Sequence, residues 1–268
     1  MSVFNNQVVV ITGGSDGIGK ALVEQFLALG ARVATCGRSQ DKLNQLQLQH
    51  LGASLFLKGV DVRSEQECAQ FIEDVIATWG QIDVLINNAG ISMRALITET
   101  TTETLKQVMD INFWGTVYTT RAALPAIMKQ KGVIVGVSSI AGYRGLPGRS
   151  GYSASKYAVN GWLEALRTEL LESGTNVMRV CPGFTSSNIR NAALNSIGES
   201  QGESPMDEGA MMSSEECAGH IANAIEKRKR TLVLTFTGKR AVFMNKFFPA
   251  LADKLVRKFF FKNNELVK

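Results

Sequence analysis

A regular alternation of short apolar runs with amphipathic stretches constrains the fold of this chain more than any other feature. QVVVIT at 7–12 and ARVATC at 31–36 are rich in β-branched residues, as expected for strands that are buried on both faces. The stretch 17–29 between them has helical periodicity and ends at Gly30, a typical helix terminator. Strands that alternate with crossover helices form a parallel sheet with helices on both faces. The sequence therefore predicts an α/β fold with a doubly wound sheet.

The same alternation continues as far as residue 235. Five further strands are expected, at 53–61, 82–88, 132–139, 175–183 and 231–235. Further helices are expected at 40–51, 64–79, 100–131, 152–172 and from 213 to the basic run at 227–230. Capping boxes at Ser64–Glu67 and Thr100–Glu103, and a cap at Ser213, mark three of the helix starts. Because no repeat or linker interrupts this pattern, we expect one catalytic domain at 1–236 and an extension at 237–268.

Composition excludes several classes of protein. No apolar run approaches the ~20 residues of a membrane span, and the N-terminus has neither the basic start nor the apolar length of a signal peptide. We therefore expect a cytoplasmic protein. The four scattered cysteines favour reduced thiols, and His50 and His220 have no companion ligands, so no metal site is expected.

Tyr152 and Lys156 lie in the pentapeptide YSASK, where a predicted helix begins. Residues i and i+4 share a helix face, so the two side chains point the same way. One interpretation is a surface pair, with the lysine stem along the ring. The other is a phenol whose pKa is lowered by the ammonium and which donates a proton near neutral pH. The pentapeptide alone leaves both open.

The stretch TGGSDGIG at 12–19 joins the first predicted strand to the first predicted helix. Its glycines allow a tight turn and a close approach of a pyrophosphate to the helix N-terminus, where amide donors and the helix dipole favour an anion. A tight turn without a ligand has similar glycines. The position between strand and helix favours a nucleotide site.

The spacing T-G-x-x-x-G-x-G resembles that of the short-chain dehydrogenase/reductase family. The resemblance covers residues 7–235 and rests on six segments in the family's order. These are TGGSDGIG, NNAG at 87–90, Asn112 in DINFWG, Ser139 in VSSIAG, YSASK, and PG at 182–183. The family implies a seven-stranded Rossmann sheet and NAD(P)-dependent interconversion of ketones and alcohols.

The resemblance also implies roles for individual residues. Tyr152 would be the proton donor, Lys156 would lower its pKa and hold the nicotinamide ribose, and Ser139 would hydrogen-bond the substrate oxygen. Asn112 would hold a water that links Lys156 to solvent. The implied cofactor contacts are Gly13, Ser15, Asp16, Gly17, Ile18, Gly19, Arg38, Ser39, Asp61, Val62, Asn88, Ala89, Gly90, Tyr152, Lys156, Pro182, Gly183, Thr185 and Ser187. At Ser187 the family often has threonine.

The end of the second strand indicates which nicotinamide cofactor is preferred. An acidic residue there grips the adenine ribose hydroxyls and selects NAD. This chain has Gly37 instead, followed by Arg38, which can pair with a 2′-phosphate. We therefore expect NADP(H) to be preferred over NAD(H), although Asp16 in the glycine loop would weaken the preference.

Two segments bear on the substrate. In the family, the stretch equivalent to 184–212 covers the substrate. Met206, Met211 and Met212 are compatible with an adaptable apolar lid there and, equally, with a mobile surface loop. The tail carries the basic charge: from Lys227 onward there are 12 basic and 2 acidic residues, a net charge of +10, against 17 and 22, a net of −5, before it. The basic charge of the tail says nothing about the main domain, and we expect no nucleic-acid partner.

The tail also has helical periodicity, with Leu251, Leu255 and Phe259 four residues apart and basic residues between them. Pro249 predicts a division into two helices. A basic amphipathic helix with phenylalanines can lie in a membrane interface. The alternative is a helix that packs on its own subunit or on a partner. The tail resembles those of hydroxysteroid dehydrogenases and related membrane-associated reductases.

Together these features predict an NADPH-dependent oxidoreductase that reduces a lipophilic ketone. The ketone would be steroid-like or a long-chain keto-lipid. The reaction could also run in the opposite direction, as oxidation of the alcohol. Relatives imply a homodimer or homotetramer through the helices at 104–130 and 152–172. A non-catalytic NADP-binding redox sensor or scaffold is the competing class. Such a protein would tolerate loss of the four catalytic residues, and all four are present.

Overall fold

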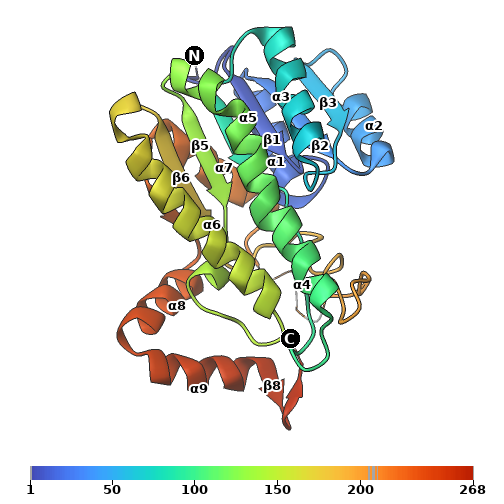
Figure 1. Ribbon diagram of the computed structural model, residues 1–268, viewed down its shortest axis with the longest axis vertical. Coiled ribbons are helices and arrows are strands. Elements are labelled where there is room, and N and C mark those ends of the chain that lie inside the picture. Colours follow the sequence, from blue (N-terminus) through green and yellow to red (C-terminus); the bar gives the residue numbers. More distant parts are fainter. Residues whose placement is uncertain (1, 205, 207–208, 210, 268) are drawn as a thin grey trace.

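The computed structural model describes residues 2–204, 206, 209 and 211–267, and in this part of the chain seven parallel strands form one sheet (Figure 1). The strand order is β3-β2-β1-β4-β5-β6-β7. The strands are β1 (Val8–Thr12), β2 (Arg32–Gly37), β3 (Leu55–Gly59), β4 (Val84–Asn87), β5 (Val133–Val137), β6 (Asn176–Cys181) and β7 (Thr231–Val233). The order reverses between β1 and β4, which is where doubly wound sheets bind their ligands. The predicted fold class is confirmed.

The middle of the sheet is buried on both faces because successive side chains of a strand point to opposite sides. In β1, Val9 and Ile11 belong to one apolar core cluster, and Val8 and Val10 belong to the other. Val9 pairs with residues of both neighbouring strands, which fixes the parallel register at the centre of the sheet. A continuous run of β-branched residues is therefore compatible with a single strand here.

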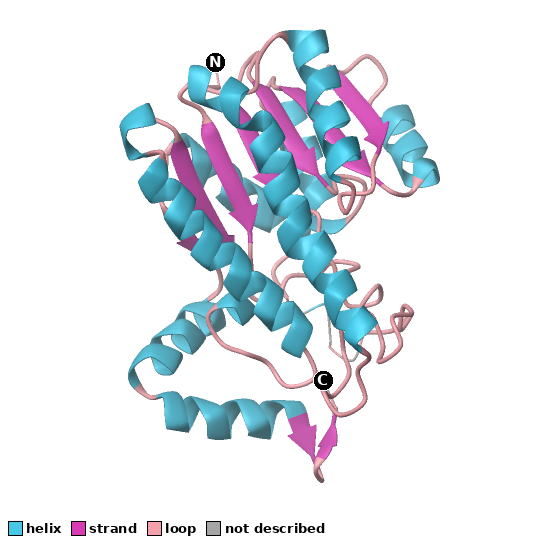
Figure 2. Cartoon of the chain, viewed as in Figure 1, coloured by secondary structure: helices cyan, strands magenta, loops and turns pink. Residues whose placement is uncertain are grey.

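Helices form a layer on each face of the sheet (Figure 2). The first core cluster is closed by α1 (Gly17–Ala28), α2 (Gln40–Gln49) and α7 (Ser214–Glu226). The second is closed by α3 (Glu65–Trp79), α5 (Gly115–Lys129) and α6 (Ser150–Glu169). A shorter helix, α4 (Thr102–Met109), precedes α5 and contacts α6.

The helix starts agree with the predicted caps except at one position. Ser64 and Ser213 each accept a hydrogen bond from the backbone three residues later, as N-caps do. The predicted cap at Thr100 is wrong: the N-cap of α4 is Thr101, which accepts from the Thr104 N–H at 3.2 Å. Thr100 instead donates its hydroxyl to the Leu96 carbonyl at 2.7 Å.

The long helix expected at 100–131 is interrupted by one π-helical turn, Asp110–Trp114, between α4 and α5. Its central residue is Asn112, which the turn directs into the interior. π-Helical turns are rare and occur frequently at functional sites. The helical periodicity of the sequence does not reveal this turn.

The C-terminal extension forms two helices, α8 (Phe236–Phe247) and α9 (Pro249–Phe260), followed by the short strands β8 (Phe261–Lys262) and β9 (Glu265–Leu266). Pro249 occupies the first turn of α9, as predicted. Figure 1 shows both helices beyond the carboxyl ends of the strands. They pack on their own chain: Asp253 of α9 pairs with Arg144, and the Asn245 amide of α8 donates to the Tyr143 carbonyl at 2.7 Å.

In the described part of the chain, none of the helices combines the length and the apolar character that crossing a membrane requires.

Candidate active site

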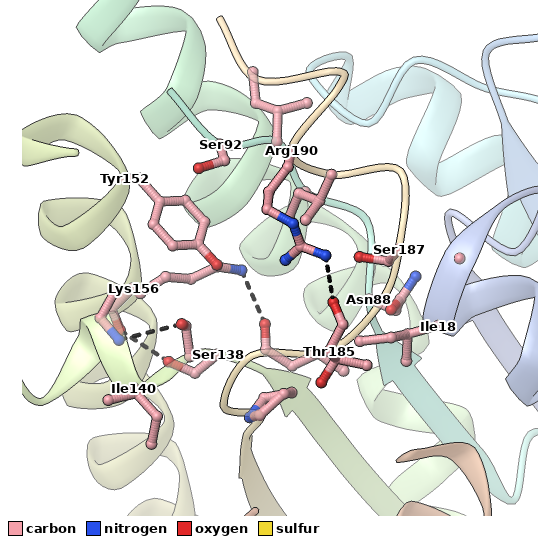
Figure 3. Close-up of a pocket in the computed structure, with 18 of the residues that line it drawn as sticks. Ile18, Asn88, Ser92, Ser138, Ile140, Tyr152, Lys156, Thr185, Ser187 and Arg190 are labelled. Carbon is pink, nitrogen blue, oxygen red and sulfur yellow. Dashed lines mark hydrogen bonds between the residues drawn. The ribbon is translucent and has the colours of Figure 1, made fainter. Parts of the chain in front are cut away.

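A cavity of about 760 Å³ opens at the carboxyl ends of the strands. It extends from the glycine loop to α9, so it joins both halves of the sheet to the C-terminal extension. All the predicted cofactor-contact residues line it, and so do Ser139, Tyr152 and Lys156. Of the residues predicted to act in catalysis, Asn112 alone lies behind the cavity wall. Figure 3 shows Tyr152 and Lys156 on one side and Ile18 and Asn88 on the opposite side.

The glycine loop is held in a shape that leaves room for a ligand backbone. Asp16 is the N-cap of α1 and accepts a hydrogen bond from the Gly17 N–H at 2.8 Å. A Cβ at Gly19 would lie 2.1 Å from the Gly13 carbonyl oxygen, so a larger residue would displace the loop. The Asn88 amide donates to the Gly13 carbonyl at 3.1 Å and ties the end of β4 to the loop. This cradle fits a pyrophosphate at the start of α1.

Cations gather at the end of β2, where the adenine ribose of a dinucleotide would lie. Arg38 and Lys42 both line this part of the cavity. Lys42 forms an ion pair with Asp16. Burial alone would raise the pKa of Asp16, but the Lys42 ammonium and the Asn188 amide hold it below its ordinary value. The acid that was expected to oppose a phosphate is therefore partly neutralised by a lysine.

Asn112 organises the wall behind the catalytic side chains. Its amide oxygen accepts from the Ile91 N–H at 2.8 Å, and its amide nitrogen donates to the Ile91 carbonyl at 2.9 Å. The same nitrogen donates to the Ser155 hydroxyl at 2.9 Å. A buried amide with these partners is fixed in one orientation. Asn112 thus connects the loop after β4 to α6.

Lys156 is buried one turn after Tyr152 on α6. Its ammonium lies 5.7 Å from the centre of the Tyr152 ring and donates to the Val137 carbonyl at 2.9 Å. Burial lowers the pKa of Lys156 to about 8, because an ammonium loses its hydration inside the protein. The ammonium is still the main form at neutral pH. The surface-pair interpretation of YSASK does not fit this burial.

The surroundings of Tyr152 raise the pKa of its phenol, whereas a lowered pKa was expected. Burial raises the pKa of Tyr152, and the Ser139 hydroxyl and the Arg149 and Arg190 guanidinium groups counter this only in part. Tyr152 is consequently protonated at neutral pH. A protonated phenol beside a hydroxyl can donate a proton to an oxygen, and a nearby cation can then stabilise the phenolate.

Ser139 ends the loop that follows β5. Its hydroxyl oxygen accepts from the Ala141 N–H at 3.1 Å, so it also acts as the N-cap of a short 3₁₀ turn, Ile140–Gly142. This contact orients the hydroxyl next to Tyr152.

The segment 184–212 lines the cavity with residues different from those expected. Among the described residues that line the cavity, Met206, Met211 and Met212 do not occur, and Met212 packs against the first core cluster, so the methionine lid stays a prediction. Phe184, Thr185 and residues 187–190 do line it. Residues 205, 207, 208 and 210 of this segment lie outside the described part of the chain. The apolar cover comes instead from α9, where Phe260 is buried and Phe259 stacks on Phe184 at 6.0 Å between ring centres.

The basic residues of the cavity that sequence reasoning missed include Lys42, Arg149 and Arg190. The guanidinium of Arg190 donates to the Thr185 carbonyl at 2.8 Å and crosses the cavity in Figure 3. Lys42 could have been found, since it lies one helical turn after Arg38 and Ser39. The two arginines belong to segments without helical or strand periodicity, so no local signal marks them.

Comparison with known proteins agrees with this geometry. The sequence model of the family described as short chain dehydrogenase matches residues 7–197. The chain is 34% identical over 259 residues to dehydrogenase/reductase SDR family member 7B from Mus musculus, covering 94% of this chain and 80% of the mouse protein. It is 31% identical over 260 residues to dehydrogenase/reductase SDR family protein 7-like from Drosophila melanogaster, covering 92% and 80%.

Two solved structures share the fold. A short chain dehydrogenase/reductase from Burkholderia phymatum in complex with NAD superposes with a TM-score of 0.81, at 22% identity, covering 94% of this chain and 96% of the other. An alcohol dehydrogenase from Thermococcus sibiricus complexed with 5-hydroxy-NADP gives 0.74, at 23% identity, covering 85% and 94%. From its sequence match and the identity to curated relatives, this chain belongs to the short-chain dehydrogenase/reductase family and is an NAD(P)-dependent oxidoreductase.

Proposed function

We propose that this oxidoreductase uses NADPH to reduce a lipophilic ketone to a secondary alcohol. The observation that carries the proposal is one continuous cavity that connects the glycine loop to Tyr152, Lys156 and Ser139. The bound cofactor supplies the hydride. The protein's own residues have to bind the ketone, orient its oxygen and provide the proton.

Tyr152 is the proposed proton donor. Since burial raises its pKa above the ordinary value, the phenol carries its proton at neutral pH, as a proton donor in ketone reduction must. The Ser139 hydroxyl would donate a hydrogen bond to the same ketone oxygen, on which negative charge develops. After proton transfer, the Lys156 ammonium and the Arg149 guanidinium stabilise the phenolate electrostatically.

We propose that Asn112 positions Tyr152 and Lys156 without contacting the substrate. Its contacts with Ile91 and Ser155 hold the wall against which α6 lies. A water linking Asn112 to Lys156 would return the proton from solvent, as the family resemblance implies.

The proposed preference for NADP(H) rests on charge at the end of β2. Arg38 can form bidentate hydrogen bonds with a 2′-phosphate, and Lys42 adds a second cation nearby. A side chain at Gly37 would approach the Ser15 hydroxyl to 2.9 Å, so a ribose-gripping carboxylate does not fit there without rearrangement. The pairing of Asp16 with Lys42 reduces the repulsion that an acid in the loop would exert.

The proposed lipophilic substrate follows from the lining of the cavity away from the glycine loop. Apolar side chains there come from three separate segments: Leu146 before α6, Ile189 after β6, and Val256 and Phe260 of α9. Apolar walls of this kind bind ligands by removing apolar surface from water.

The same extension supports a proposed contact with a membrane surface. Phe247 and Phe248, at the turn between α8 and α9, are 55% and 51% exposed, and Phe243 and Leu251 are exposed beside them. Lysines flank this apolar group, among them Lys246. Phenylalanines with surrounding lysines bind anionic bilayers through apolar burial and charge attraction. A lipophilic ketone would then reach the cavity from the membrane along α9.

A homo-oligomer through α5 and α6 remains our proposal for assembly. Trp114, Met128 and Tyr157 are large apolar side chains that these segments expose. Light scattering coupled to size exclusion would measure the mass, and a monomer at micromolar concentration would contradict the proposal.

The function is tested by following NADPH consumption with steroid, short-chain and long-chain ketones, each with NADH in parallel. We expect turnover to be fastest with a long-chain or steroid ketone and with NADPH. Turnover of short polar ketones alone would contradict the proposed substrate. A clear preference for NADH would contradict the proposed cofactor.

A further inference from the structure

We propose that Arg149 binds an acidic group of the ketone substrate, a carboxylate or a phosphate, next to Tyr152. The proposal rests on the reductase function proposed above and names the chemical class of its substrate. The substrate would be amphiphilic, with an apolar chain, a ketone and an anionic group close to the ketone.

Among the residues that the structure describes, Arg149 is a buried cation without an anionic partner. Its residue is 8% exposed, and its Nε atom is buried and has no hydrogen-bond partner, as is also true of the Nε atom of the ion-paired Arg144. Its contact with an aromatic group is a stacking of the guanidinium over Phe260, with 5.9 Å between the guanidinium carbon and the ring centre. Within the described residues, no carboxylate pairs with it. Burying a guanidinium without a counter-charge costs free energy, so such a residue is retained where a ligand supplies the charge.

The other arginine that α9 contacts shows what a paired residue looks like here. Arg144 lines the same cavity, but it pairs with Asp253 and donates to the Asn245 amide oxygen at 3.1 Å. Arg144 therefore attaches the C-terminal helices to the domain. Arg149 contacts α9 by stacking on Phe260, and among the described residues it has no ion pair of this kind.

The surroundings of Arg149 are positive. Burial lowers its pKa, and the cations Arg190 and Arg94 lower it further, while Tyr152 acts in the opposite direction. Among the described residues that line the cavity, the acidic ones are Asp16 and Asp61, which lie at the glycine-loop end and pair with Lys42 and Arg63. Arg94 is paired with Glu203 and Arg144 with Asp253, whereas none of the described carboxylates forms an ion pair with Arg149.

The position of Arg149 in the chain also matches a role in substrate binding. Arg149 directly precedes α6 and stands three residues before Tyr152, so an anion bound to it lies near the reacting carbonyl. The N-terminus of α6 adds the positive end of its helix dipole to the same place. The Phe260 ring covers one face of the guanidinium, which leaves the edge for the paired hydrogen bonds that carboxylates and phosphates form with arginine.

The test compares acidic and neutral ketones of equal chain length. The probes are a medium-chain 4-oxo acid, its methyl ester, and the corresponding 4-oxoalkyl phosphate, with NADPH. We expect the wild type to prefer at least one acid over the ester in kcat/KM. Arg149→Gln should lower the ratio of acid to ester by about tenfold to a hundredfold, the range of hydrogen bonds to charged groups, and Arg149→Lys should restore part of it.

Arg240→Gln is the matched control, because Arg240 is an exposed arginine that also lines the cavity and should leave the ratio unchanged. An equal loss for acid and ester in Arg149→Gln would limit Arg149 to stabilising the phenolate or the fold and would overturn the proposal. The relative loss for the acid and for the phosphate identifies which anion is bound.

A binding measurement separates this inference from the proposed function. Decanoate, decyl phosphate and decanol are titrated calorimetrically into the NADP⁺-loaded wild type and Arg149→Gln. Tighter binding of either anion than of decanol, lost in the variant, supports the anion site even if no ketone is turned over. Turnover of neutral ketones, together with no preference for either anion, would overturn the anion site and leave the reductase function standing.

Discussion

Replacement of Lys156 by methionine should stabilise the folded protein near neutral pH while it removes activity. The folded protein holds this ammonium in a buried position, where burial lowers its pKa from 10.5 to about 8. A difference of this size corresponds to about 3 kcal/mol, at about 1.4 kcal/mol for each pKa unit, by which the charged lysine destabilises the fold at pH 7. Methionine has a similar length and no charge.

Two opposing contributions give the size of the effect. The variant loses the hydrogen bond from the ammonium to the Val137 carbonyl at 2.9 Å, which contributes about 2 kcal/mol as a bond to a charged group. The expected net gain in the free energy of unfolding at pH 7 is therefore about 1 kcal/mol. The gain depends on pH, because the unfolded chain binds more protons than the folded chain between pH 8 and 10.5. Wild-type stability rises across this window as the penalty disappears.

Urea unfolding of the wild type and of Lys156→Met at pH 7 and pH 10 measures the prediction. The free-energy difference between the two proteins should shift by roughly 2 kcal/mol in favour of the wild type at the higher pH. Lys129→Met, at an exposed lysine in the last turn of α5, is the control and should show little change. A difference between Lys156→Met and wild type that is the same at both pH values would refute the reasoning.

Three further predictions concern catalysis, the cofactor and the membrane. The rate of ketone reduction should fall as pH rises through about 8, because Lys156 loses the charge that stabilises the phenolate; a rate that is flat from pH 6 to 10 contradicts this. Arg38→Gln should lower kcat/KM for NADPH by about tenfold or more and affect NADH less, which paired steady-state assays measure. Phe247→Ser with Phe248→Ser should weaken sedimentation with vesicles of anionic phospholipid at low salt, whereas equal sedimentation would argue for packing alone.

The sheet was predictable because its central strands are buried on both faces and read as continuous β-branched runs. The helix caps were predictable where a single serine precedes the helix, as at Ser64. At Thr100 and Thr101 two adjacent hydroxyls satisfy the same pattern, and the path of the backbone decides between them. The π-helical turn around Asn112 depends on its contacts with Ile91 and Ser155, which are distant in sequence.

The part of the cavity at the glycine loop was predictable because its residues follow the carboxyl ends of neighbouring strands, which a parallel sheet brings together. The part of the cavity lined by α9 was not. Phe260 reaches the cavity because α9 folds back over the strand ends, and this packing has no local sequence signal. Arg149 is marked only by its burial and lack of a counter-charge, which require the tertiary structure.

The most direct test of the account is the comparison of Tyr152→Phe with wild type in NADPH-dependent ketone reduction, with NADPH affinity measured separately by fluorescence titration. Loss of the proton donor should lower kcat by a factor of about 10² to 10⁴, while NADPH affinity changes little. Retention of most of the rate, with the cofactor still bound, would contradict the assignment of Tyr152 as the proton donor.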